Sequence, residues 1–182
     1  CLFPMLKGSD LANGKVPRKF MLVPQTKIGQ DTRHLAKSAP KTWKYLVRYG
    51  ESLDKRGSSI YKDKPRFSIF GVGDYTFSDW KVAIPALYKK LEFCVIGPHQ
   101  NKPMVFDDTV NFIALDNAEE AQELAELLNS RTAHGFYRSF IFWDSKRPIT
   151  VQLLKNLDID QLQSESGKEN NYSIRKTSRQ LQ

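Results

Sequence analysis

The stretch FSIFGVGDYTFSDWKVAI, residues Phe67–Ile84, decides how the chain is interpreted. Its segment Gly71-Val72-Gly73 is similar to the glycine-rich turn of a nucleotide or S-adenosylmethionine pocket. Such a turn needs a helix directly after it, because the free N–H groups of the helix bind the anionic part of the cofactor. In residues 75–77 and 80–84 large apolar side chains instead alternate with small or polar ones, which is typical of strands. We therefore expect an aromatic β-hairpin, with no cofactor bound by this chain.

The remaining sequence favours an α+β fold with a mixed or antiparallel sheet and a few packed helices. Two helical patterns stand out, at residues 39–53 and 116–130, and Asn117 is placed to cap the second. A short third helix is expected after Thr150. Segments rich in aromatic and β-branched residues predict strands at Phe20–Val23, Phe67–Phe70, Tyr75–Phe77, Trp80–Ile84, Glu92–Ile96, Met104–Phe106 and Val110–Leu115.

The length of 182 residues and the 40% hydrophobic content suit a packed domain. We expect one folded domain over residues 1–162, followed by a polar, flexible tail over residues 163–182. The first residue is Cys rather than Met, which is typical of a fragment. With no apolar run long enough to span a bilayer and no secretory signal pattern, a cytoplasmic location is expected. The two cysteines, Cys1 and Cys94, fit a reducing compartment.

The net charge of +8 is unevenly distributed along the chain. Residues 1–66 hold 15 Lys/Arg and 5 Asp/Glu, whereas residues 67–163 hold 9 and 13. A basic half on an acidic body indicates an anionic partner, of which nucleic acid is the commonest. The alternative is a basic surface that serves only solubility.

Cations and a glycine-rich tip around the expected hairpin make up most of the candidate nucleic-acid contacts. Lysine and arginine pair with phosphates, glycine lets a backbone approach a ligand closely, and exposed rings stack on bases. Most rings of the hairpin, such as Phe67 and Trp80, are instead expected in the core. The candidate contacts are Lys62, Lys64, Arg66, Gly71, Gly73, Tyr75 and Lys81, together with Lys146 and Arg147 from a later loop.

Two patterns imitate a metal site. Asp107-Asp108 lies between apolar segments, where a carboxylate pair more often marks a turn. FIFWDSK, residues 140–146, imitates the strand of a Mg²⁺-dependent nuclease, with Asp108, Asp144 and Lys146 as the candidate set. His34, His99 and His134 share no metal-ligand spacing. We expect no catalytic residues, no metal and no complete active site in this chain.

Several blocks of the sequence, taken in order, resemble one known family. The blocks are LKGSDL, SSIYKDKPRFSIFGVGDYTFSDWKVAI, KPMVFDDTVNFI, LLNS and FIFWDSKRPIT, and the resemblance covers Leu6–Leu162. They resemble the C-terminal target recognition region of adenine-specific DNA methyltransferases of type II restriction–modification systems, including fused restriction–methylase enzymes.

This resemblance implies that the chain corresponds to the half of the enzyme that recognises DNA. Family enzymes carry an Asn/Asp-Pro-Pro-aromatic motif and a separate glycine motif for S-adenosylmethionine, and neither occurs here. The resemblance implies that both motifs lie in a preceding methyltransferase domain of the same protein. That domain would bind S-adenosylmethionine. The implied function is sequence-specific recognition of double-stranded DNA. The alternatives are a Mg²⁺ nuclease and a basic scaffold that binds RNA or protein.

Overall fold

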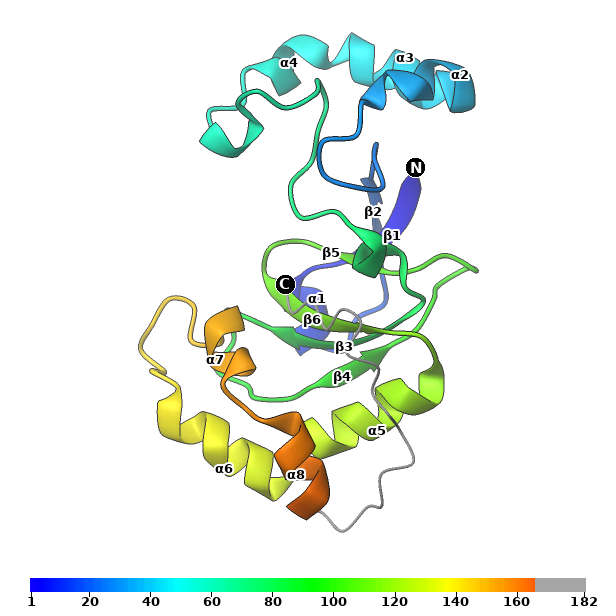
Figure 1. The fold of residues 1–182 in the computed structure, drawn as a ribbon. Coiled ribbons are helices and arrows are strands. Elements are labelled where there is room, and N and C mark those ends of the chain that lie inside the picture. The colour runs from blue at the N-terminus through cyan, green and yellow to red at the C-terminus, as the bar shows by residue number, and fades with distance from the viewer. Residues whose placement is uncertain (166–182) are drawn as a thin grey trace.

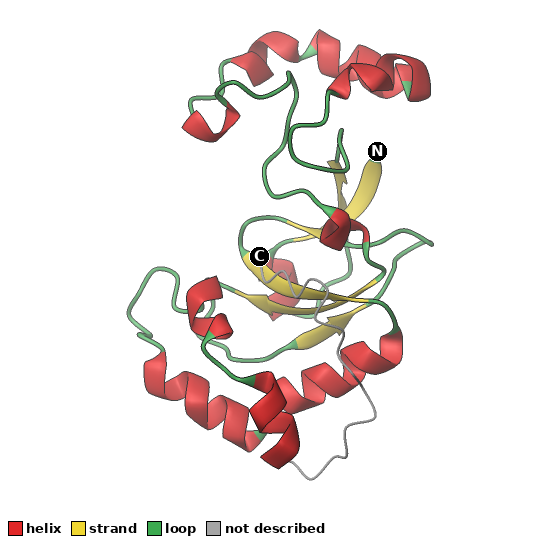
Figure 2. Ribbon diagram, viewed as in Figure 1, coloured by secondary structure: helices red, strands yellow, loops and turns green. Residues whose placement is uncertain are grey.

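The computed structural model describes residues 1–165 and has an α+β fold with two three-stranded sheets, which confirms the predicted fold class. One sheet has the strand order β2-β1-β5 and the other β4-β3-β6. Helices lie below the second sheet and at the opposite end of the molecule (Figures 1 and 2). Residues 166–182, and with them most of the predicted tail, lie outside the described residues.

The β4-β3-β6 sheet is antiparallel and forms the centre of the larger body. Its middle strand, β3 (Trp80–Pro85), pairs with β4 (Cys94–Ile96) on one side and with β6 (Val110–Leu115) on the other. Val82 and Ile84 point to one face and Ala83 to the other, and all three are buried. Because both faces of β3 are covered, the strand reads as a nearly continuous apolar run.

Four helices supply the main core on the face of the sheet that carries Val82 and Ile84. They are α5 (Ala118–Leu128), α6 (Arg131–Phe140), α7 (Val151–Lys155) and α8 (Ile159–Glu165) (Figure 1). The predicted caps are confirmed: Asn117 accepts a hydrogen bond from Glu120 N, and Thr150 accepts one from Leu153 N. These caps fix where α5 and α7 begin.

The second sheet joins the N-terminus to the middle of the chain. In it β1 (Leu2–Leu6) runs antiparallel to β2 (Lys19–Leu22) and parallel to β5 (Val105–Phe106). Between β1 and β2, the short helix α1 (Gly8–Ala12) packs on the face of β3 opposite the main core.

Residues 26–66 form a separate group of helices, which we call the helical lobe (Figure 1). It contains α3 (Pro40–Arg48) and α4 (Gly50–Asp54), which together confirm the predicted helix, with Pro40 in the first turn. Its remaining elements are η1 (Thr32–His34), α2 (Leu35–Ser38) and η2 (Ser59–Tyr61). A small core of its own, centred on Leu35, Leu46 and Phe67, holds the lobe together.

The predicted aromatic hairpin does not form. Phe67 has φ +66°, in the left-handed region that a strand excludes, and Gly71 has φ +70°. Residues Asp74–Phe77 form the 3₁₀ turn η3 rather than a strand, so the strands expected at 67–70 and 75–77 are wrong. Tertiary packing explains the difference, since Phe67 is buried against Trp43 of the helical lobe, with ring centroids 5.5 Å apart.

The strand that the nuclease alternative requires in FIFWDSK is absent. Phe140 is the last residue of α6, and an irregular loop follows to Pro148. The other predicted strands are present, some of them shorter than expected. Within residues 1–165, no helix has the length and apolar character that crossing a bilayer requires.

Candidate nucleic-acid interface

The outer face of α3 carries cations and aromatic rings at helical spacing. Trp43 and Leu46 turn inward to the core of the lobe. The opposite face is exposed and consists of Lys41, Lys44, Tyr45, Arg48 and the following residue Tyr49, which we call the α3 stripe. Their spacing of three and four residues places these side chains side by side on one surface.

The two tyrosines of the α3 stripe form a pair. Their ring centroids lie 4.8 Å apart with an interplanar angle of 51°. The guanidinium carbon of Arg48 lies 5.7 Å from the centroid of Tyr49. Both rings stay about half exposed, at 55% for Tyr45 and 45% for Tyr49. Exposed rings beside cations have the composition of a surface that binds phosphates and stacks on or packs against bases.

The predicted contacts Lys62 and Lys64 are exposed on the same lobe, in the segment between η2 and Phe67. Arg56 supports this segment from within: its Nη1 donates to Ser68 O at 2.7 Å, and its guanidinium lies 3.9 Å from the Tyr61 ring centroid. Within residues 1–165, neither lysine nor any cation of the α3 stripe forms an ion pair.

Arg66, another predicted contact, is used inside the lobe. Its Nη2 donates to Asp54 Oδ2 at 2.7 Å, and its Nε lies 3.1 Å from both carboxylate oxygens. The hydrogen bond from Arg66 lowers the pKa of Asp54, and the same bond raises the pKa of Arg66. Arg66 therefore fastens its loop to α4 and is not positioned as a free phosphate ligand.

The predicted tip residues have structural surroundings. Tyr75 is buried, with its ring 6.0 Å from that of Phe112. A Cβ atom at Gly73 would lie 2.6 Å from the Tyr75 ring, so this glycine leaves room for the ring. Gly71 supplies the positive φ of the turn. The 3₁₀ turn after Gly73 spans four residues, unlike the long helix of a dinucleotide fingerprint.

Lys81 was predicted to contact DNA, and the structure buries it completely. Its Nζ donates to the carbonyl oxygen of Ser78 and lies 5.9 Å from the Phe112 ring centroid. Burial lowers the pKa of Lys81 to about 8, against the opposing effect of the Asp79 charge. A side chain enclosed in this way does not reach a ligand on the surface.

Lys146 and Arg147 are exposed in the loop between α6 and α7, which belongs to the larger body and not to the helical lobe (Figure 1). The structure therefore does not bring them together with Lys62 and Lys64. Arg147 Nη2 lies 3.2 Å from Asp108 Oδ2.

The carboxylates of the alternative nuclease set are engaged with cations. Asp108 pairs with Arg147, and Asp144 pairs with Lys89 at 3.3 Å. Asp107 accepts hydrogen bonds from the Thr109 backbone and hydroxyl, which makes Asp107-Asp108 part of a turn as expected. Among the described residues, no group of three or more His, Cys, Asp or Glu side chains is arranged to hold a metal ion.

The sequence pattern placed the predicted contacts at residues 62–81 and 146–147, and it did not pair Tyr45 with Tyr49. A usable signal was present, because Lys41, Lys44, Tyr45, Arg48 and Tyr49 follow helical periodicity opposite Trp43 and Leu46.

The chain is similar to part of a longer methyltransferase. It is 50% identical over 163 residues to the Type II methyltransferase M.NspV of Nostoc sp.. The matched region covers 88% of this chain but only 34% of that relative, so the chain spans about a third of the length of the methyltransferase. No family model and no solved structure matches the chain. The similarity relates the chain to a segment of a Type II methyltransferase.

Proposed function

We propose that the chain is the DNA target recognition region of a site-specific, adenine-specific DNA methyltransferase of a restriction–modification system. The α3 stripe is the observation that carries this proposal, since its cations and rings share one exposed face. The similarity to a third of a Type II methyltransferase supports it, because that length leaves room for a separate catalytic part.

In this proposal the helical lobe grips duplex DNA. Lys41, Lys44 and Arg48 neutralise phosphates, and Lys62 and Lys64 add exposed cations on the same lobe. An α-helix fits the major groove, where the edges of the four base pairs differ. Tyr45 and Tyr49 would then lie against sugars or base edges. These cations set affinity and position, and the rings contribute to the choice of sequence.

The methyl transfer itself is assigned to residues outside this chain. A preceding methyltransferase domain of the same protein would bind S-adenosylmethionine and methylate an adenine turned out of the duplex. Gripping the flanking duplex holds it in place during that step. Such an enzyme acts on cellular DNA, so we place it in the cytoplasm.

Competition binding on the full chain tests the proposal. A labelled duplex that contains the parent enzyme's methylation site should be displaced by the same unlabelled duplex at lower concentration than by a random duplex or structured RNA. Equal displacement by the random duplex and the RNA would favour a general basic scaffold instead.

Calorimetric titration with S-adenosylmethionine separately tests the proposal that the cofactor binds outside this chain. The isolated chain should show no saturable binding, because Gly73 is followed by a single 3₁₀ turn. Micromolar binding would place the cofactor site in this chain and overturn that assignment.

A further inference from the structure

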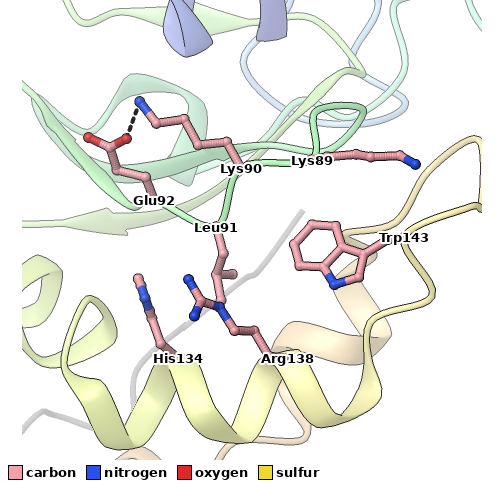
Figure 3. Close-up of a pocket in the computed structure, with 7 residues that line it drawn as sticks. All are labelled: Lys89, Lys90, Leu91, Glu92, His134, Arg138 and Trp143. Carbon is pink, nitrogen blue, oxygen red and sulfur yellow. Dashed lines mark ion pairs between the residues drawn. The ribbon is translucent and has the colours of Figure 1, made fainter.

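A pocket of about 580 Å³ lies between the segment that connects β3 to β4 and the helix α6. This volume falls in the range of sites for small ligands. Figure 3 shows His134 and Arg138 rising from α6 toward the Lys89–Glu92 segment, with the indole ring of Trp143 at one side. The pocket belongs to the larger body and is separate from the α3 stripe of the helical lobe (Figure 1).

The lining has more positive than negative charge. Lys89, Lys90 and Arg138 contribute cations, whereas Glu92 is the one carboxylate among the lining residues. Lys90 pairs with Glu92, and Lys89 pairs with Asp144 outside the lining at 3.3 Å. Arg138 has no ion pair within residues 1–165. Its fork of N–H donors matches the oxygens of a phosphate.

His134 adds a polar atom that has no partner in the protein. Its Nε2 is buried and makes no hydrogen bond within residues 1–165. Burial, followed by the nearby charge of Arg138, lowers the pKa of His134, which favours the neutral ring. A neutral imidazole donates one hydrogen bond and accepts another, and a buried nitrogen without a partner is costly. Because Nε2 is itself closed to solvent, His134 forms part of the pocket wall rather than a contact for a ligand.

Trp143 gives the pocket a flat, apolar wall. Its ring is half-buried and packs against the main core, which holds it in place. Rings of this kind stack on nucleobases. The combination of an unpaired guanidinium, two lysines and a fixed indole suits a ligand that has both a phosphate and a planar ring.

We propose that this pocket binds a nucleotide, with the phosphate between Arg138 and the Lys89–Lys90 segment and the base against Trp143. The phosphate-bearing nucleotide has two sources, a free mononucleotide and a nucleotide of a DNA strand. This inference goes beyond the proposed recognition function and does not depend on it, since mononucleotide binding is measured without any duplex.

The test is titration of the full chain with four separate probes: AMP, adenosine, inorganic phosphate and a short single-stranded oligonucleotide. Trp fluorescence and NMR detect the binding of each probe. AMP should bind more tightly than adenosine or phosphate, because only AMP fills both halves of the pocket. Arg138→Gln should weaken AMP binding about tenfold or more, as expected for loss of a charge-assisted contact. Arg131→Gln is the matched control, since Arg131 is exposed on the same helix and does not line the pocket.

A second variant changes affinity in the opposite direction. Asp144→Asn removes the carboxylate that holds Lys89, so it should tighten AMP binding while the fold is retained. If only the oligonucleotide binds, and if Arg138→Gln abolishes this binding while Arg131→Gln does not, the phosphate in the pocket belongs to a DNA strand. The inference would be overturned if no probe bound at millimolar concentration. It would also be overturned if Arg138→Gln and Arg131→Gln lowered AMP affinity equally.

Discussion

Arg66 binds Asp54 through two nitrogens, with Nη2 2.7 Å from Oδ2 and Nε 3.1 Å from both oxygens. This contact joins the end of the loop that carries Lys62 and Lys64 to the last residue of α4. Two exposed lysines are thereby held on the same lobe as the α3 stripe. Surface ion pairs contribute little to global stability, so the effect of this one is expected in the local order of the loop.

Arg66→Ala and Asp54→Ala should each speed amide hydrogen exchange in the loop, at Tyr61, Lys62 and Lys64. These amides donate short-range hydrogen bonds within the loop, to Ser58, Ser59 and Tyr61 respectively. The double variant should exchange no faster than either single variant, because both remove the same contact. Additive effects would mean that Arg66 and Asp54 act through different partners.

Lys81→Met should raise the free energy of unfolding at pH 7 by up to about 3 kcal/mol, because it removes a buried charge whose pKa is lowered to about 8. The pH dependence has a defined sign. Between pH 8 and 10 the unfolded chain keeps the Lys81 proton and the folded chain loses it, so wild-type stability rises with pH.

Urea unfolding of both proteins at pH 7, 8, 9 and 10 measures this effect. The advantage of Lys81→Met should shrink over that range by up to about 1.4 kcal/mol per pH unit, while other titrating groups cancel in the comparison. A constant difference from pH 7 to pH 10 would show that Lys81 titrates normally in the folded chain.

Two glycines should respond in opposite directions to substitution by alanine. A Cβ atom at Gly8 would lie 2.8 Å from the carbonyl oxygen of Thr109, so Gly8→Ala should destabilise the fold by roughly 1–3 kcal/mol. Gly135, within α6, has nothing within 4 Å of a Cβ atom. Gly135→Ala should therefore stabilise by roughly 0.5–1 kcal/mol through helix propensity. Thermal unfolding checks both, and stabilisation by Gly8→Ala would show that the Thr109 turn yields easily.

Duplex DNA should stay intact when incubated with the wild type or with Asp144→Asn in the presence of Mg²⁺. Asp144 pairs with Lys89, and Asp108 pairs with Arg147, so these carboxylates serve surface contacts in the structure. Gel electrophoresis over a long incubation checks this. Metal-dependent cutting by the wild type that disappears in Asp144→Asn would support the nuclease alternative.

Local signals explain what the sequence predicted well. Asn117 and Thr150 bind the first turns of their own helices, so their caps are visible within four residues of sequence. The class of the fold and the stretch around α3 follow from apolar periodicity in the same way. These features do not depend on how distant segments pack.

Features that the sequence did not reveal depend on contacts between distant segments. Phe67 takes a left-handed backbone conformation because it packs into the helical lobe, and its sequence neighbours do not reveal this. The strand pattern predicts an exposed Lys81, yet the side chain is buried and contacts Ser78 O and the Phe112 ring. The sequence suggests that Arg66 is a phosphate ligand, whereas in the structure Arg66 forms an ion pair with Asp54. Charge patterns identify a basic surface but not which cations the fold itself uses.

The measurement that tests the central claim most directly is duplex affinity across a salt series for Lys44→Ala and Arg48→Ala. Lys155→Ala is the control, an exposed lysine at the end of α7 in the larger body. If α3 holds phosphates, each α3 variant should weaken binding and lower the slope of log affinity against log salt by about one unit, whereas Lys155→Ala should match the wild type. Unchanged slopes for Lys44→Ala and Arg48→Ala would contradict the account and place the DNA on another face.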